Sequence, residues 1–341
     1  MSFVMEKNAL GSLITVLRKR GYELYGPLRK GPEFVFGPIN QANDLALDYV
    51  TTIISPKKYL YAPSEKLFSF NSDGFNIKES SNGTGKQALL AVHPCDLNAI
   101  AILDKVRTSG AAFEDPKYKE NRNNTFLVGM NCSKAGEECF CPSFGTGPDA
   151  KQGFDLLLTD LGDGYLVESG SDSGKSVAAD LKLKKSTPSD MQEKERKVRA
   201  VRQSIKRGIS TDGLPKALDK NFNHEIWGKL KDDCYSCGTC TTVCPTCYCF
   251  NVVDNIDFSL KNGERVRNWD SCQLIDFGQV ALGGNFRKDR DARVKQWIYH
   301  KLNSFPQQYG GTFACVGCGR CIKNCTKGID MTNVVKSLQT A

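Results

Sequence analysis

The chain has 341 residues, of which 40% are hydrophobic, so it can form a sizeable core in two domains or in one domain with a large appendage. No run of about 18 apolar residues occurs, and residues 1–17 lack the features of a signal peptide. We therefore expect no membrane-spanning helix and no secretion, and the protein is expected in the cytoplasm. The formal charge of +8 indicates no partner by itself, because metal-bound thiolates among the fifteen cysteines would offset it.

The first part of the chain is predicted to form a mixed α/β domain over residues 1–180. It opens with a predicted helix over residues 6–20, which has apolar side chains at helical spacing and Gly21 at its end. A strand should follow, and residues 96–106 are predicted to be a second helix with Asp96 as its N-cap. Further β-rich runs are residues 34–36, 67–70, 88–92, 126–130, 154–158 and 165–168.

Four cysteines of this domain follow predicted strands or lie in the loops beside them. Cys95 comes after the run 88–92, and Cys132 comes after the run 126–130. Cys139 and Cys141 belong to the next loop, and both can reach one cluster only if the chain bends at the residue between them. Ligand sites in α/β sheets gather at the carboxyl ends of strands. We therefore expect an iron–sulfur cluster at these four thiols, with free buried thiols as the alternative.

A basic segment over residues 182–207 follows, and Pro188 suits the first turn of a helix there. Acidic residues are interleaved with the basic ones, and the segment contains no aromatic residue of the kind that stacks on RNA bases. A solvated helix face is therefore predicted and nucleic acid is not, although docking of an acidic partner stays possible. With a helical stretch near residues 217–230, this segment forms a predicted connector over residues 181–230.

Two cysteine runs of one pattern, C-x2-C-x2-C-x3-C, dominate residues 231–341. They are Cys234, Cys237, Cys240 and Cys244, followed by Pro245, and Cys315, Cys318, Cys321 and Cys325. This pattern is typical of proteins that bind two 4Fe-4S clusters, in which the fourth cysteine of each run ligates the other cluster. We assign Cys234, Cys237, Cys240 and Cys325 to cluster 1, and Cys315, Cys318, Cys321 and Cys244 to cluster 2. Two clusters held close together indicate that electrons pass from one cluster to the other.

Structural zinc is the alternative for these eight cysteines, because paired C-x2-C knuckles also bind that ion. Doubling of the four-cysteine pattern, with a proline after the first run, favours clusters. A reducing compartment is implied in either case, since oxidation to disulfides would remove the ligands.

Residues 246–314 separate the two runs, unlike in simple two-cluster ferredoxins, and are predicted to be a structured insertion with a helix over residues 289–302. The predicted fold class is α+β: the mixed α/β domain, then a bacterial-ferredoxin-like α-helical domain carrying this insertion. Cys247, Cys249 and Cys272 are expected as buried structural thiols. Alternatively, they replace some of the four N-terminal cysteines as ligands.

No substrate site is predicted. Residues 82–87 and 170–176 imitate phosphate-binding loops, but the first lacks the leading glycine and the hydroxyl, and the second is one residue short. Both are predicted to be turns. No G-x-G-x-x-G fingerprint follows a strand, and the three histidines are scattered along the chain.

With these pieces in their order and spacing, the sequence resembles the beta subunits of cytoplasmic nickel–iron hydrogenases of the sulfhydrogenase type. It is also similar to the A-type subunit of anaerobic sulfite reductase. The resemblance covers residue 88 to the C-terminus, and residues 153–170 are more similar to the hydrogenase version. It rests on residues 93–99, 131–132, 139–141, 145–148, 234–250, 269–272, 283–287 and 315–325. One departure is Thr326, where many ferredoxin runs have proline.

The resemblance implies a hetero-oligomer in which this protein passes electrons between a flavin subunit that uses NAD(P)H and a catalytic subunit. The catalytic subunit is a nickel–iron hydrogenase in one case and a sirohaem protein in the other. The residues themselves leave two other classes open: a zinc-stabilised or nucleic-acid-binding protein, and an enzyme with a cluster-based site of its own.

Overall fold

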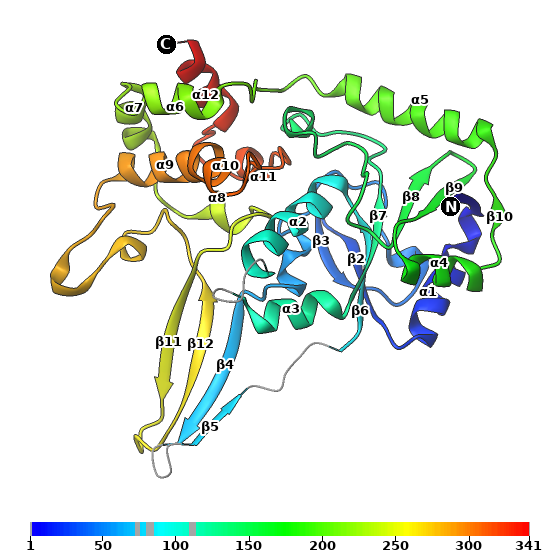
Figure 1. The fold of residues 1–341 in the computed structure, drawn as a ribbon, viewed down its shortest axis with the longest axis horizontal. Coiled ribbons are helices and arrows are strands. Elements are labelled where there is room, and N and C mark those ends of the chain that lie inside the picture. The colour runs from blue at the N-terminus through cyan, green and yellow to red at the C-terminus, as the bar shows by residue number, and fades with distance from the viewer. Residues whose placement is uncertain (1, 72–75, 80–84, 109–113, 341) are drawn as a thin grey trace.

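The computed structural model describes residues 2–71, 76–79, 85–108 and 114–340. Its centre is an eight-stranded sheet with the order β10-β1-β9-β8-β7-β6-β2-β3 (Figure 1). The neighbours β2, β6, β7 and β8 run parallel, and the outer strands pair antiparallel. Their bounds are β1 Ser2–Glu6, β2 Glu23–Lys30, β3 Glu33–Pro38, β6 Gln87–Val92, β7 Thr125–Met130, β8 Leu156–Asp160, β9 Gly164–Ser169 and β10 Lys184–Lys185. The β-rich runs predicted in this region are therefore confirmed as strands, except that the run 154–158 becomes a strand only from Leu156.

Helices cover both faces of this sheet. Helices α1 (Leu10–Lys19) and α4 (Asp172–Asp180) pack on one face, and α2 (Pro94–Thr108) and α3 (Pro116–Asn123) pack on the other. The strands are buried on both sides because alternate residues face opposite layers: Phe126 and Val128 of β7 pack under α1, whereas Leu127 packs under α2.

Three local predictions were wrong. The first helix begins at Leu10 and not at residue 6, because Ser2–Glu6 form β1 and pair with β9. Asp96 is not an N-cap, since α2 already begins at Pro94 and the Asp96 carboxylate is ion-paired with Arg320. Residues 170–176 are not merely a turn, because Ser171 caps α4 there. Residues 82–84 of the other phosphate-loop imitation lie outside the described residues.

A second sheet joins the N-terminal part of the chain to the predicted insertion. Its order is β11-β12-β4-β5, and it projects from the body of the molecule as an arm (Figure 1). Strands β11 (Phe250–Ile256) and β12 (Asn262–Trp269) form a hairpin, and β12 pairs antiparallel with β4 (Ser64–Asn71), which pairs with β5 (Asn76–Glu79). Segments almost 200 residues apart in the sequence are therefore hydrogen-bonded strands.

Helix α5 (Pro188–Ser204) lies beside β9 (Figure 1), and the other remaining helices pack around the two cysteine runs. They are α6 Leu214–Lys220, α7 Ile226–Asp233, α8 Thr239–Thr242, α9 Arg290–Tyr299, α10 Phe305–Gln308, α11 Arg320–Lys323 and α12 Met331–Thr340. The helix start at Pro188 is confirmed, with Thr187 and Asp190 forming a capping box. The predicted stretch 217–230 is two helices, α6 and α7, whose buried faces meet Trp297 and Val335. No helix in the described part of the chain is long and apolar enough to cross a membrane.

Candidate iron–sulfur sites

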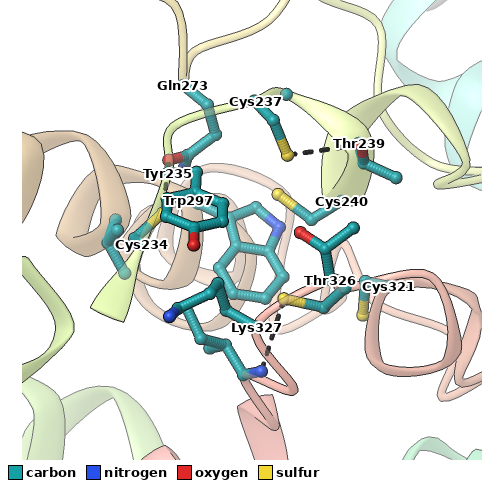
Figure 2. A pocket seen from close by; sticks show the side chains of 14 residues that line it. Cys234, Tyr235, Cys237, Thr239, Cys240, Gln273, Trp297, Cys321, Thr326 and Lys327 are labelled. Atoms are coloured by element: carbon teal, nitrogen blue, oxygen red, sulfur yellow. Dashed lines mark hydrogen bonds between the residues drawn. The ribbon is translucent and has the colours of Figure 1, made fainter. Parts of the chain in front are cut away.

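The first candidate site is a pocket between α8, α9 and the end of the second cysteine run (Figure 2). Its lining includes the thiols of Cys234, Cys237, Cys240, Cys321 and Cys325. Gly238, with φ +77°, turns the chain between two of these thiols, and a Cβ there would press on Ser271 at 3.1 Å. The pocket lies at the surface, since Cys237 is exposed.

Backbone donors point at these sulfur atoms. The N–H groups of Ser236 and Ile329 donate to the Sγ atoms of Cys234 and Cys325, each at 3.3 Å. Hydrogen bonds of this kind favour the thiolate form that a metal needs. The indole of Trp297 also lines the pocket (Figure 2), and its buried Nε1 has no hydrogen-bond partner among the described residues. A sulfide or thiolate of a cluster would supply that partner, so the donor set fits an iron–sulfur group.

The second candidate site adjoins the first. Its lining includes Cys244, Cys315, Cys318 and Cys321, with Phe140, Val316 and Met331 as apolar wall. Cys321 and Trp297 line both pockets, so the two sites share a wall. Each pocket thus holds thiols from both runs, in the crossed grouping that the spacing predicts. This geometry supports the ligand assignment, which stays a prediction about bound clusters.

The thiols of the second site are partly buried. Burial raises the pKa of Cys315 to about 12 and that of Cys318 to about 11. Without a metal these groups are therefore protonated at neutral pH, and iron would have to displace the protons. Among the described residues, no group of three or more His, Cys, Asp or Glu side chains is placed to hold a single metal ion.

The four N-terminal cysteines gather beside the second site. Burial raises the pKa of the Cys132 thiol, and the neighbouring thiols of Cys141 and Cys139 raise it further. Burial likewise raises the pKa of Cys95, with smaller contributions from Asp96, Cys318 and Cys132. The side chain of Phe140 is fully buried between Cys139 and Cys141. The structure thus brings the four predicted thiols together, next to Cys318 of the second site.

Close backbone contact fixes these loops against the second cysteine run. The N–H of Phe140 donates to the carbonyl of Gly317 at 2.8 Å. A Cβ at Gly317 would lie 2.6 Å from the Phe140 backbone, and one at Gly319 would lie 2.4 Å from the Glu138 carbonyl oxygen. Only glycine allows this approach, and both residues also have positive φ.

A buried ion pair makes the same connection between the two parts of the chain. Arg320, between Cys318 and Cys321, donates to both carboxylate oxygens of Asp96 at 2.7 Å, and both side chains are 1% exposed. Arg320 also donates through Nε to the carbonyl of Thr52 at 2.8 Å. A bidentate pair with no access to water fixes the α2 start against the cysteine run.

Two buried lysines near Cys244 were missed by the sequence analysis. Lys301 donates to the Sγ of Cys244 at 3.3 Å and to the hydroxyl of Thr246 at 3.0 Å. Lys57 donates to the carbonyl oxygens of Cys244 and Cys247 at 2.8 and 2.7 Å, and its ammonium lies 4.1 Å from the centre of the Trp269 ring. Nothing in the local sequence distinguishes either residue from the surface lysines, which are the usual case.

The three remaining cysteines line a separate cavity of about 380 Å³. Cys247 is a close neighbour of Cys244, and Cys249 is a close neighbour of Cys272. The cavity therefore adjoins the second site on its Cys244 side, whereas the N-terminal thiols adjoin Cys318. This grouping gives no support to the alternative in which these cysteines replace N-terminal ligands.

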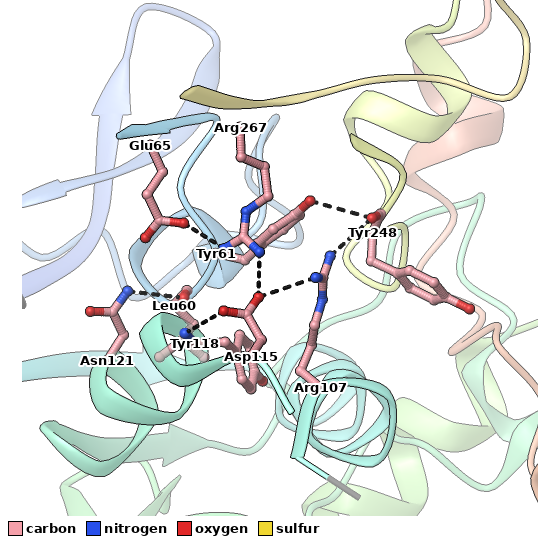
Figure 3. Close-up of polar contacts among 9 residues, drawn as sticks. All are labelled: Leu60, Tyr61, Glu65, Arg107, Asp115, Tyr118, Asn121, Tyr248 and Arg267. Carbon is pink, nitrogen blue, oxygen red and sulfur yellow. Dashed lines mark hydrogen bonds and ion pairs between the residues drawn. The ribbon is translucent and has the colours of Figure 1, made fainter. Parts of the chain in front are cut away.

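An ion-pair network holds the segment around Cys247 and Cys249 to the N-terminal part (Figure 3). Asp115 accepts hydrogen bonds from Arg107 at 3.1 Å and from Arg267 at 2.5 Å, and Arg267 also pairs with Glu65 at 2.5 Å. Arg107 donates in turn to the backbone carbonyl of Tyr248 at 3.1 Å. The arm and the cysteine segment are thus tied to α2 and α3 by buried charges.

Comparisons with known proteins agree with this arrangement. Residues 233–329 match the family model described as "4Fe-4S dicluster domain". The chain is 36% identical over 318 residues to sulfhydrogenase 2 subunit beta of Pyrococcus furiosus, and the alignment covers 93% of this chain and 92% of that protein.

Proposed function

Because the chain belongs to the sulfhydrogenase beta-subunit family, we propose that it relays electrons between a flavin subunit that uses NAD(P)H and a nickel–iron hydrogenase subunit. It is an electron-transfer subunit, and its dicluster domain implies two 4Fe-4S clusters. When bound, such clusters supply one-electron carriers. The observation that carries the proposal is the crossed grouping of eight thiols in two pockets that share Cys321.

Different residues of the chain would bind the two clusters, orient the ligand sulfur atoms and exclude water. Cys234, Cys237, Cys240 and Cys325 would hold cluster 1, and Cys315, Cys318, Cys321 and Cys244 would hold cluster 2. Backbone N–H groups at Ser236, Ile329 and Gly317 orient the sulfur atoms. Trp297 and Phe140 keep water away from the shared wall, since their side chains are 4% and 0% exposed.

A third cluster at Cys95, Cys132, Cys139 and Cys141 belongs to the same proposal. Its support is the gathering of these thiols beside Cys318 and the glycine contacts that hold their loops against the cluster 2 run. The three sites then follow one another from the buried N-terminal thiols, through the second pocket, to the first pocket with its exposed Cys237. An electron could enter or leave at that exposed end.

The ferredoxin-like part of the fold would hold the two clusters, and the insertion adds further elements to it. The two runs end in the short helices α8 and α11, which contact each other, while residues 246–314 add the β11-β12 hairpin and α9. We propose that this helical core is the dicluster unit and that the insertion links it to the N-terminal sheets.

The relay is tested in the purified complex with the variant Cys321→Ala, which removes the thiol shared by both pockets. Electron transfer from NAD(P)H to hydrogen should fall at least tenfold. Dye-linked hydrogen turnover by the hydrogenase and dye reduction by NAD(P)H at the flavin should persist, because neither reaction needs the relay. Tyr235→Phe, an exposed change beside the same pocket, is the matched control.

Unchanged NAD(P)H-linked hydrogen turnover in Cys321→Ala would contradict the proposal. Co-purification of a sirohaem protein in place of a nickel–iron hydrogenase would contradict the choice of catalytic partner and favour a sulfite reductase complex.

A further inference from the structure

The cavity of about 380 Å³ lies outside the three sites proposed above and is lined by residues whose sulfur and nitrogen atoms can bind iron. The thiols of Cys247, Cys249 and Cys272 line it, and so does the imidazole of His300. Cys272 is 8% exposed, and the other two cysteines are partly buried. A group of soft sulfur ligands with an imidazole, in a protein of a reducing compartment, is suited to iron–sulfur chemistry.

Two buried lysines beside this cavity, Lys57 and Lys301, form no ion pair with a carboxylate of the described residues. Lys57 and Lys301 are each 3% exposed. The acidic groups that neighbour Lys57 are the thiols of Cys247, Cys244 and Cys249. Those that neighbour Lys301 are the thiols of Cys244, Cys247 and Cys315. Two like charges buried side by side are costly unless anions accompany them. The structure therefore calls for negative charge at the cavity as well as at the second site.

The walls that carry the three thiols are rigidly held. Lys57 binds the carbonyl of Cys247, Arg107 binds the carbonyl of Tyr248, and the N–H of Asp270 donates to the carbonyl of Cys249 at 3.0 Å. On the other wall, Ser271 accepts from the Thr241 hydroxyl at 2.7 Å, next to Cys272. A segment fixed at three successive carbonyls presents its thiols in one arrangement, which is what a cluster site needs.

The cavity also lies within the electron path. Lys301 lines both this cavity and the second pocket, and Trp297 lines the cavity and both pockets. Any redox group in the cavity would thus adjoin both proposed clusters.

We propose that Cys247, Cys249 and Cys272 bind an additional iron–sulfur cluster in this cavity. The thiolates of Cys247, Cys249 and Cys272 would hold it, and the imidazole of His300 in the same wall would be available as a further ligand. Lys57 and Lys301 balance its charge. The inference adds a centre to the relay and does not depend on the third cluster at the N-terminal cysteines.

The test measures iron and acid-labile sulfide in the natively purified complex, without chemical reconstitution. The triple variant Cys247→Ala, Cys249→Ala, Cys272→Ala should lose about four iron and four sulfide per chain relative to the unmodified complex. Phe277→Ala, which changes the same cavity wall but removes no thiol, should lose none. The double variant Cys132→Ala, Cys139→Ala reports on the N-terminal cluster independently.

Unchanged iron in the triple variant would overturn the inference, as would the loss of one zinc per chain with iron unchanged. If the double variant alone loses four iron, the inference fails while the relay stands. If the triple variant alone loses them, the cavity holds a cluster and the N-terminal site does not. Should the triple variant lose all clusters through misfolding, Cys249→Ser decides: a change in one paramagnetic signal supports the inference, and an unaltered spectrum overturns it.

Discussion

At the scale of single residues, the charge beside cluster 2 is the most consequential feature. Lys301 lies 3.3 Å from the Sγ of Cys244 and is 3% exposed. Burial lowers the pKa of Lys301, but the interactions with Cys244 and Cys247 outweigh burial and hold this pKa well above its usual value. The ammonium therefore stays charged, and a positive charge near a cluster favours the reduced state.

Lys301→Met should accordingly shift the reduction potential of cluster 2 to more negative values, on the order of 100 mV for a buried unit charge. Potentiometric titration followed by paramagnetic resonance measures the shift, and the signal of cluster 1 should move less. Lys295→Met is the matched control, because Lys295 is on α9, directly before the π-helical segment His300–Ser304 that carries Lys301, but lies over the Phe222 ring at 4.1 Å. Equal potentials in Lys301→Met and the unmodified protein would show that this charge does not act on the cluster.

The buried imidazole of His93 makes the stability of the fold depend on pH. Its ring stacks on Tyr49 at 3.9 Å and hydrogen-bonds through Nδ1 to the Val50 carbonyl at 3.0 Å. Burial lowers the pKa of His93 from 6.5 to about 4, although Asp96 opposes this shift. Between these two pH values the unfolded chain binds more protons than the folded chain, so stability falls as the pH falls through that window.

His93→Gln should therefore flatten the pH dependence of stability between about pH 6.5 and 4, where the histidine contribution is on the order of 3 kcal/mol. Chemical unfolding at a series of pH values measures it. Part of the pH dependence of stability should remain in the variant, because burial also lowers the pKa of His300 to about 4. An identical pH profile in the variant and the parent would contradict this role of His93.

At the scale of elements, the contact between the second cysteine run and the 138–141 loop decides whether the N-terminal thiols stay beside cluster 2. Gly317→Ala would place a methyl group 2.6 Å from the Phe140 backbone, whereas Gly328→Ala has nothing within 4 Å. Both glycines have positive φ, +61° and +64°, so both variants bear the same conformational cost.

Gly317→Ala should therefore lose about 1–3 kcal/mol more unfolding free energy than Gly328→Ala, since only the first must also push two backbones apart. Thermal unfolding of the two variants, with iron content alongside, makes the comparison. Equal losses would mean that the loop can move away from the cysteine run at no cost.

Elements with a strong local pattern were predictable from the sequence, and those made by distant pairing were not. The buried strands β6 and β7 appear as short apolar runs, and the two cysteine runs reveal eight candidate ligands by spacing alone. The pairing of β12 with β4 has no local signature, because its partners are segments almost 200 residues apart. Strand β1 was not predicted either. It has only five residues, lies next to the edge strand β10, and is joined to α1 by the single 3-10 turn Lys7–Ala9. Lys301 resembles any surface lysine until the fold buries it against Cys244.

At the scale of the whole molecule, buried charges hold the projecting arm and the cysteine-rich segment to the N-terminal sheet. Asp115, Arg107 and Arg267 have side chains only 8–9% exposed and form one network (Figure 3). Asp115→Ala should cost about 3–5 kcal/mol of unfolding free energy, because it leaves two buried guanidinium groups without their shared carboxylate.

Denaturant unfolding of Asp115→Ala measures this loss. The control is Asp254→Ala, which removes a solvent-exposed ion pair with Arg265 from the same arm and should leave stability unchanged. If the two variants unfold alike, the network does not connect the two parts of the molecule.

The central claim is that two adjoining 4Fe-4S clusters are held by the crossed set of eight cysteines, and paramagnetic resonance of the dithionite-reduced chain, purified without oxygen, tests it most directly. The account predicts signals from two reduced clusters that split each other's lines, because their pockets share Cys321. In Cys325→Ala only the cluster 1 signal should be perturbed, although Cys325 belongs to the second run. A colourless chain with no paramagnetic signal, or a Cys325→Ala spectrum that changes only at cluster 2, would contradict the account.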